Sequence, residues 1–170
     1  KVMNKKVMTY QYSSELIGES SKSKNENNDC FVRAISTATG STYDSAHSFV
    51  KERFQREDKK GTFVELNLEP NLKKHTIDGI TFELSKVAKS KIVNTYKLYG
   101  ELIDRQKTVK SFIKDNQKGT YIVLISKHAF TVKDGVLIDN KGMEFKPTRK
   151  VQGAIKVTVD SPVDTQLSLF

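Results

Sequence analysis

The chain has 170 residues, of which 36% are hydrophobic and 29% charged, a composition typical of one globular domain with a full core. No apolar run approaches the roughly 20 residues that cross a bilayer, and no apolar segment follows the lysines at its start. We therefore expect no membrane anchor and no secretory signal. A single cysteine excludes an internal disulfide and favours a reducing, cytoplasmic location.

The chain is basic, with 29 lysines and arginines, 20 aspartates and glutamates, and a formal net charge of +9. Such an excess allows attraction to nucleic acid. The lysines are scattered along the sequence, however, and no recognised nucleic-acid-binding motif accompanies them. We interpret most of them as a solvated surface, with weak nucleic-acid contact as the alternative.

The first half of the chain predicts a strand or arm, a loop and two helices. Apolar residues alternate within residues 1–13, and the polar, turn-rich stretch 18–29 indicates a loop. An apolar helical pattern then runs from about residue 29 to 39, and Gly40 is a natural helix stop. A second helix follows, capped by Ser41 or Thr42. Its apolar positions are Tyr43, Ala46, Val50 and Phe54.

The second half predicts mainly strands. Residues 77–84 alternate, residues 86–105 show no clear pattern, and Thr108 caps a short helix. Residues 120–126 form the clearest strand, and the turn at residues 134–135 joins two further strands. Those strands are residues 129–132 and 136–139, and a last strand is expected at 154–159. The order predicts an α+β fold with N-terminal helices packed on a C-terminal antiparallel sheet. We expect one domain, residues 1–160, and a tail, residues 161–170.

Cys30 is the strongest functional signal in the sequence. The Asx residues before it, Asn28 and Asp29 among them, predict a helix start, because their side chains accept the first unpaired backbone N–H groups. Cys30 then lies in the first turn, where the helix dipole favours negative charge on a thiol. Nucleophilic cysteines often occupy this position. A small buried core residue is the competing interpretation.

His128 and Asp139 are the candidate partners of this thiol. Cysteine hydrolysis needs a base, usually histidine, and a third group that orients the imidazole. His128 follows the clearest strand, and the hairpin turn brings it or Ala129 opposite Asp139 or its neighbour. Asn140 is an alternative orienting residue. The other histidines, His47 and His75, are interpreted as structural or surface residues. No metal-ligand spacing exists, so we expect neither metal nor cofactor.

The ordered cysteine, histidine and aspartate resemble the papain-like cysteine peptidase superfamily. Asn28-Asp29-Cys30 is similar to the entry of its bacteriocin-processing (C39-like) branch, and residues 119–139 are similar to that branch's histidine and aspartate strands. The resemblance spans roughly residues 25–140 and implies a papain-like fold. It also implies that Cys30 is the nucleophile, His128 the general base and acid, and Asp139 the orienting residue.

One position departs from the family pattern. The family has a glutamine about six residues before its cysteine, which donates to the oxyanion, whereas this chain has Lys24. Neighbouring side-chain amides and the Cys30 backbone N–H are substitutes. The amide candidates are Asn25, Asn27 and Asn28.

The last five residues, 166–170, resemble the peptide by which bacterial replication proteins bind the β sliding clamp. The resemblance implies polar contacts by Gln166 and an apolar cleft filled by Leu167, Leu169 and Phe170. The competing interpretation is that these apolar residues attach the end of the chain to the core.

Two functions follow from these patterns. The first is an intracellular cysteine hydrolase that cleaves a peptide, isopeptide or other amide bond through an acyl-thioester. The second is a non-enzymatic bacterial or phage protein that uses a peptidase-like scaffold and docks to a sliding clamp.

Overall fold

A computed structural model describes residues 8–160 and has an α+β architecture with a mostly antiparallel sheet. Its seven strands run in the order β1-β8-β7-β6-β9-β3-β2, and only the β1–β8 pair is parallel within the described residues. These strands are β1 (Thr9–Tyr12), β2 (Lys74–Ile77), β3 (Ile80–Lys86), β6 (Thr120–Ile125), β7 (His128–Lys133), β8 (Val136–Asp139) and β9 (Gly153–Val159). A separate hairpin consists of β4 (Val93–Leu98) and β5 (Glu101–Gln106). The helices are α1 (Ser13–Ile17), α2 (Ser21–Lys24), α3 (Cys30–Thr39), α4 (Tyr43–Arg53), α5 (Val64–Asn67) and α6 (Val109–Asp115).

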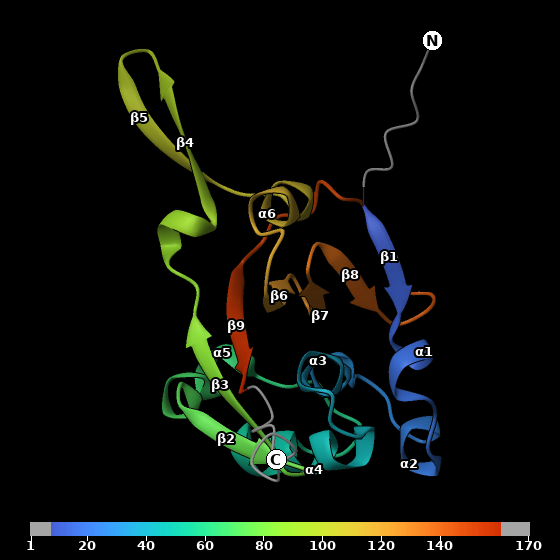
Figure 1. Cartoon of the computed structure of the whole chain (residues 1–170). Coiled ribbons are helices and arrows are strands. Elements are labelled where there is room, and N and C mark those ends of the chain that lie inside the picture. Colours follow the sequence, from blue (N-terminus) through green and yellow to red (C-terminus); the bar gives the residue numbers. More distant parts are fainter. Residues whose placement is uncertain (1–7, 161–170) are drawn as a thin grey trace, which may run out of the picture.

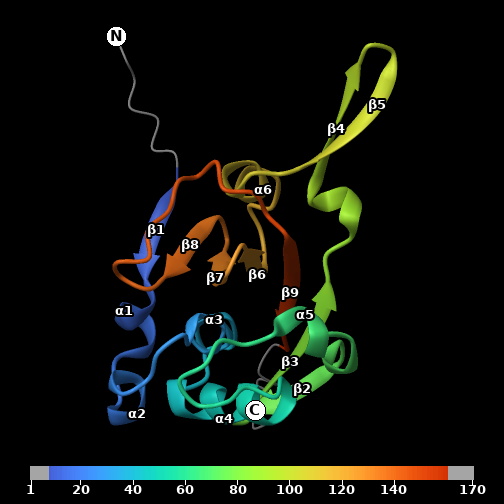
Figure 2. The same cartoon turned by 180° about the vertical axis from the view of Figure 1, so that it is seen from behind.

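Helices cover both faces of the main sheet (Figure 1). In this view α3 and α4 lie below the sheet and α6 lies above it, and the reverse view shows the same layers (Figure 2). Each face has its own core. Ile122 of β6 joins the α3 core, whereas Val123 joins the α6 core beside Phe112. Successive side chains of a strand point to opposite faces, so β6 holds the two cores together.

Helix α3 begins and ends where the sequence predicts. Gly40 follows its last residue with φ +81°, a left-handed conformation that glycine adopts without strain. Buried hydroxyl groups fix the helix on β7. Thr131 donates to the Ala34 carbonyl oxygen at 2.9 Å and accepts from the Thr37 hydroxyl at 2.8 Å. The register of α3 on the sheet, and hence the place of Cys30, follows from these bonds.

Two Asp-Gly turns close hairpins in the sheet. The predicted turn at Asp134-Gly135 joins β7 and β8, and both residues have positive φ, as a tight hairpin turn requires. Asp78-Gly79 has the same conformation and joins β2 to β3. The expected strand over residues 77–84 is therefore wrong in its bounds, because this turn interrupts it.

The polar stretch 18–29 is not only a loop, as the sequence suggested. Ser20 and Ser23 form a reciprocal capping box, in which each side chain accepts a hydrogen bond from the other's backbone N–H. This box stabilises α2 in a stretch without apolar periodicity. The predicted N-terminal strand is present as β1, which pairs in parallel with β8 and places Tyr12 beside Asp139.

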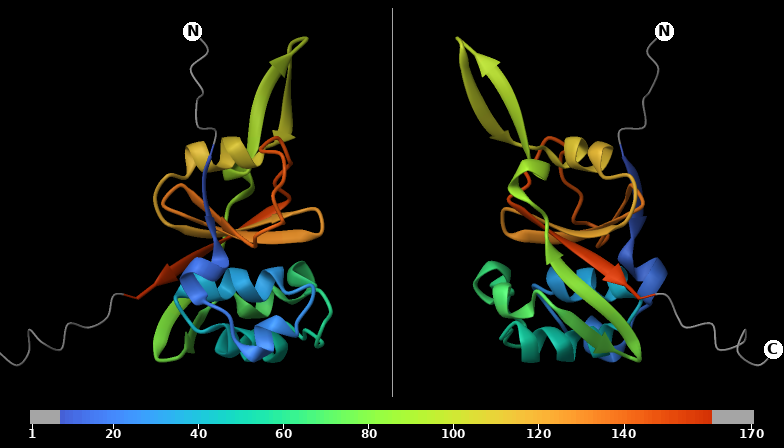
Figure 3. Two further views of the ribbon diagram at one scale, coloured as in Figure 1. Left: turned by 90° about the vertical axis from the view of Figure 1, so that its right-hand side faces the viewer. Right: turned by 60° about the vertical axis from the view of Figure 1, so that its left-hand side comes forward.

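The β4–β5 hairpin projects from the α6 end of the molecule (Figures 1 and 3). Its two strands pair with each other and with no strand of the main sheet. Residues 161–170, and with them the clamp-motif residues, lie outside the described part of the chain. Within residues 8–160, no helix is long and apolar enough to span a membrane.

Candidate active site

Cys30 is the first residue of α3, and Asn28, two residues earlier, has a strained backbone conformation. Asn28 has φ +53°, a left-handed conformation that asparagine tolerates better than most residues. Asp29 is the N-cap residue, but its side chain accepts no hydrogen bond from a backbone N–H of the first turn of the helix, contrary to the expectation. It accepts hydrogen bonds from the Tyr43 hydroxyl at 2.7 Å and from Arg33 Nε at 3.0 Å. Asp29 thus anchors the start of α3 to α4.

The side chains of His128 and Asp139 form a buried pair where β7 begins and β8 ends. The His128 Nε2 atom lies 2.6 Å from Asp139 Oδ2, and Asp139 is only 3% exposed. The other carboxylate oxygen accepts the Asn140 backbone N–H at 2.7 Å. The β7–β8 register places Thr131 opposite Ile138, so Asp139 is a diagonal neighbour of His128 on one face and not its direct partner.

The His128 ring has an electrostatic environment that favours its protonated form. Burial, the strongest single influence, acts to lower the pKa of His128, but the hydrogen bond with Asp139 and the neighbouring Cys30 side chain outweigh it. Together with the charges of these two groups they raise the pKa to about 9. Burial raises the pKa of Asp139, and its hydrogen bond with His128 opposes that effect. The protonated ring is therefore held between Asp139 and the thiol.

Two polar atoms around this pair are buried and have no hydrogen-bond partner among the described residues. One is His128 Nδ1, the ring nitrogen that Asp139 leaves free. Cys30 acts on the pKa of the same ring and so lies near it, and Nδ1 is the ring nitrogen that Asp139 leaves available to the thiol. The other is the Tyr10 hydroxyl, whose pKa is raised by burial and by the charge of Asp139, so it stays neutral.

A cleft of about 680 Å³ opens over Cys30 and His128. Its walls come from three segments: the loop and start of α5 at residues 60–65, the β6–β7 turn, and residues 140–143. Phe63 is 74% exposed at the rim, and Met143 is also exposed. The Thr62 hydroxyl is buried in this wall without a partner among residues 8–160. The cleft can hold an extended chain with apolar side chains.

The amide candidates occupy different places. Asn28 and Asn140 line the cleft, and each is held by one hydrogen bond. The Asn28 amide donates to the Lys59 carbonyl oxygen at 3.1 Å, and the Asn140 side chain accepts from the Ser13 hydroxyl at 2.8 Å. Asn25 lies outside the cleft, where its amide donates to Ser21 O at 2.9 Å.

The third amide candidate, Asn27, does not line the cleft, and its backbone carbonyl oxygen accepts from Arg56. Lys24, at the position of the family's glutamine, is exposed on α2. Gln152 does line the cleft, but it lies far from Cys30 in the sequence and carried no motif that could have identified it.

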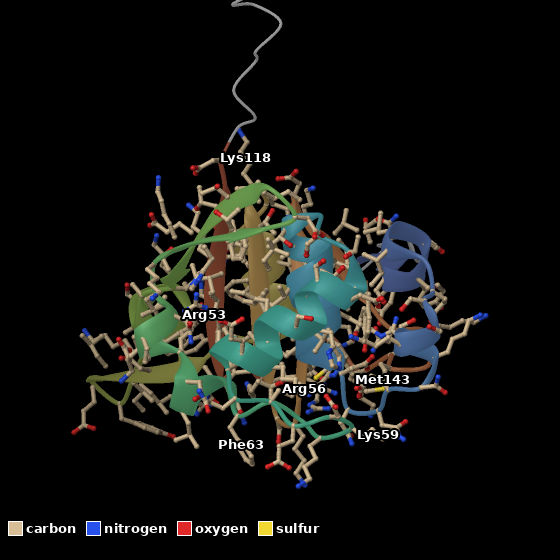
Figure 4. The ribbon with its side chains drawn as sticks, turned by 90° about the horizontal axis from the view of Figure 1, so that it is seen from below. Arg53, Arg56, Lys59, Phe63, Lys118 and Met143 are labelled. Carbon is tan, nitrogen blue, oxygen red and sulfur yellow. The ribbon has the colours of Figure 1, made fainter. Side chains whose placement is uncertain are left out.

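A buried ion network supports the backbone before Cys30, and no motif in the sequence predicts it. The Arg56 side chain is fully buried and donates to Glu26 at 2.9 Å and to the Asn27 carbonyl oxygen at 3.0 Å. Glu26 also accepts the Lys59 backbone N–H at 2.9 Å. These hydrogen bonds attach residues 26–28 to residues 56–60. Figure 4 shows Arg56 and Lys59 on the same side of the molecule as Phe63 and Met143 of the cleft.

His47 completes this network, so its predicted structural role fits its surroundings. Its Nε2 atom lies 2.7 Å from Glu26 Oε1 and 3.7 Å from Asp58. Glu26, His47 and Asp58 are close enough together to ligate a metal ion. The Arg56 guanidinium, 3.2 Å from the same His47 nitrogen, already supplies the positive charge there. His75 is buried and bonded to the Asn71 carbonyl oxygen at 2.9 Å.

The chain was also compared with known proteins. No model of a protein family, no curated protein and no solved structure matches it.

Proposed function

We propose that the protein is a papain-like cysteine hydrolase that cleaves a peptide, isopeptide or other amide bond. The observation that carries this proposal is the arrangement around His128. Asp139 engages Nε2 at 2.6 Å, the Cys30 side chain lies near enough to the ring to raise its pKa, and both Cys30 and His128 line one cleft. A nucleophile, a base and an orienting group at one cleft are what cysteine hydrolysis needs.

The reaction follows from these positions. Transfer of the thiol proton to the His128 ring precedes attack and leaves a protonated ring beside the Cys30 thiolate, and the thiolate sulfur then attacks the carbonyl carbon of the substrate. The oxyanion is stabilised by the Cys30 backbone N–H, which has no partner inside the helix, and by the second amide hydrogen of Asn28. When the C–N bond breaks, the ring returns the proton to the leaving amine. Water, activated by the same ring, then hydrolyses the thioester and regenerates the thiol.

The substrate class proposed is a polypeptide in an extended conformation. The cleft has a volume of about 680 Å³, and the exposed side chains of Phe63 and Met143 line it together with Cys30 and offer apolar contacts. We propose that the protein acts in the cytoplasm, where a free thiol is maintained.

Alkylation of Cys30 by iodoacetamide tests the proposal directly. We expect the thiol to react faster than free cysteine near neutral pH and to lose most of that advantage in His128→Ala. Cys30→Ala should abolish hydrolysis of a peptide library and leave the melting temperature nearly unchanged. A thiol that reacts no faster than free cysteine, or hydrolysis that survives in Cys30→Ala, would contradict the proposal.

Clamp docking is the second proposed function, and residues 166–170 support it by sequence alone. Their pattern, Gln-Leu-Ser-Leu-Phe, fits a peptide that fills an apolar cleft on a partner. It would make this a bacterial or phage protein that acts near DNA replication. Deletion of the five residues should abolish association with a bacterial sliding clamp in a pull-down of purified proteins. No association of the intact chain, or unchanged association after deletion, would refute it.

A further inference from the structure

The positive charge of the chain is concentrated in two segments. Residues 86–118 contain nine lysines and arginines against three acidic residues, and residues 141–150 contain four against one. The rest of the chain has sixteen basic and sixteen acidic residues. The whole formal excess of +9 therefore comes from about a quarter of the residues. The lysines that look scattered along the sequence are not evenly distributed in the fold.

Backbone hydrogen bonds bring these segments together at one end of the molecule. The N–H of Val109 donates to the Arg149 carbonyl oxygen at 2.9 Å, and that of Lys107 donates to Ile92 at 2.9 Å. The start of α6, the root of the β4–β5 hairpin and the turn before β9 are thus neighbours (Figure 3). We call the exposed basic residues of this region the basic end: Lys89, Lys91, Arg105, Lys110, Lys114, Lys146 and Lys150.

The side chains of the basic end are free to meet an anionic ligand. None of the seven forms an ion pair with another residue of the described range 8–160. Lys107, by contrast, is buried and paired with Asp115, so it belongs to the fold and not to this surface.

The hairpin above the basic end exposes an unusual amount of apolar surface. Tyr99, at the turn, is 98% exposed, Leu102 is 77% exposed, and Tyr96 and Leu98 are also exposed. Tyr96 and Asn94 share one face of β4, because alternate residues of a strand point the same way. The Asn94 amide donates to the Ser111 hydroxyl of α6 at 3.4 Å, so this face looks toward α6 and its lysines.

We propose that this face of the hairpin and the basic end together bind single-stranded nucleic acid. The bases stack on Tyr96 and Tyr99, and the lysines and Arg105 neutralise the phosphates. Base stacking on an exposed aromatic ring contributes about 1–3 kcal/mol and does not depend on sequence. The proposal does not rest on the chemistry at Cys30, which lies in a different part of the fold.

Other ligands fit these observations less well. A second copy of the chain would bring two basic ends together, and their charges would repel. A duplex has its bases already stacked and unavailable to tyrosine. The hairpin tip could insert into a lipid surface. Strands of six residues would then separate that surface from the hairpin root, and so from the basic end, by roughly 20 Å. That distance exceeds the Debye length of about 8 Å at physiological salt, so the basic end would contribute little. An acidic polypeptide offers charge but no flat base to stack.

Fluorescence anisotropy with labelled oligothymidylate tests the proposal on the full chain. Binding should weaken about fiftyfold from about 50 to about 200 mM salt if four phosphates are contacted. Tyr96→Ala and Tyr99→Ala should each weaken it about tenfold, and Lys110→Glu with Lys114→Glu should weaken it at least as much. Lys22→Glu with Lys24→Glu, on exposed lysines of α2, makes the same change in charge away from the basic end and should leave binding within about twofold.

Competitors decide among the ligand classes. A duplex of equal length, polyglutamate and anionic phosphatidylglycerol vesicles should each compete poorly with the single strand. Equal competition by any one of them would overturn the proposal in favour of that class. The proposal also fails if no salt-dependent binding occurs, or if the tyrosine variants bind as well as the original protein while circular dichroism shows them folded.

Discussion

Replacement of Arg56 by alanine is expected to destabilise the fold by several kcal/mol. The guanidinium is fully buried and bonded to Glu26, itself only 7% exposed, and to the Asn27 carbonyl oxygen. In Arg56→Ala the Glu26 carboxylate keeps His47 and the Lys59 N–H but loses its permanent cation. Removal of one partner from a buried ion pair costs about 3–5 kcal/mol, because the other charge stays buried. That is a large share of a total stability of about 5–15 kcal/mol.

The assay is urea unfolding of Arg56→Ala beside Arg53→Ala, a control with the same substitution at the last residue of α4, three residues earlier. Arg53 is exposed, and Figure 4 shows it well apart from Arg56. Its replacement should change the free energy of unfolding by no more than about 0.5 kcal/mol. Equal losses in the two variants would refute the argument, because they would show that the buried network contributes nothing specific.

The pH dependence provides a second check on the same variant. Burial acts to raise the pKa of Glu26, but hydrogen bonds from Arg56 and His47 outweigh it and lower the pKa from 4.5 to about 2. A lowered carboxyl pKa contributes stability that is complete above pH 4.5 and is lost as the pH falls toward 2. The difference between the original protein and Arg56→Ala should therefore shrink across this range. A difference that stays constant with pH would contradict the assigned role of Glu26.

Three further predictions concern the site and the core. His128 should titrate near pH 9 by NMR, and Asp139→Ala should move its pKa toward 6.5. The stability that His128 contributes should be complete below pH 6.5 and lost as the pH rises through 9. A pKa near 6.5 in the original protein would contradict the contacts described. Asn28→Gly should retain the fold but slow hydrolysis, because the Asn28 amide that stabilises the oxyanion is lost. Asn28→Ala should in addition destabilise the fold, because the backbone there has φ +53°. Equal hydrolysis rates in Asn28→Gly and the original protein would restrict Asn28 to a conformational role. Phe112→Ala should lower the free energy of unfolding in urea by about 3–5 kcal/mol, because Phe112 is fully buried. Phe63→Ala at the cleft rim should leave stability unchanged and weaken peptide hydrolysis. Similar unfolding midpoints for the two variants would refute the core assignment.

The elements predicted well from the sequence are those with a buried face and a local end signal. Helix α3 has an apolar stripe and Gly40, α6 has Thr108 as its cap, and β6 is a run of branched and aromatic residues. The Asp134-Gly135 turn then fixes which strand returns beside β7. Local chemistry therefore sufficed to bring His128 and Asp139 together, although the register differs from the one expected.

The elements that were missed have patterns that the sequence does not display. The β4–β5 hairpin is exposed on both faces, so no alternation of apolar and polar residues marks it. Its turn, Tyr99-Gly100, does have positive φ at both residues, as in the other tight hairpins. Asp78-Gly79 is a turn signal of the same type as Asp134-Gly135, and it accounts for the true start of β3 at Ile80. The structural role of Arg56 is not predictable from the sequence, because it depends on Glu26, thirty residues earlier in the chain.

The candidate site depends on both layers of the fold. Cys30 comes from α3, in the core on one side of the sheet. The His128 ring, in contrast, packs against Phe130 and Phe145, which belong to the core on the α6 side, with centroids 5.9 Å and 6.1 Å away. The thiol and the ring are therefore positioned by separate cores that meet only through the sheet. A cavity in the α6 core should thus disturb the ring while leaving the helix start in place, so damage to activity and damage to α3 can be separated.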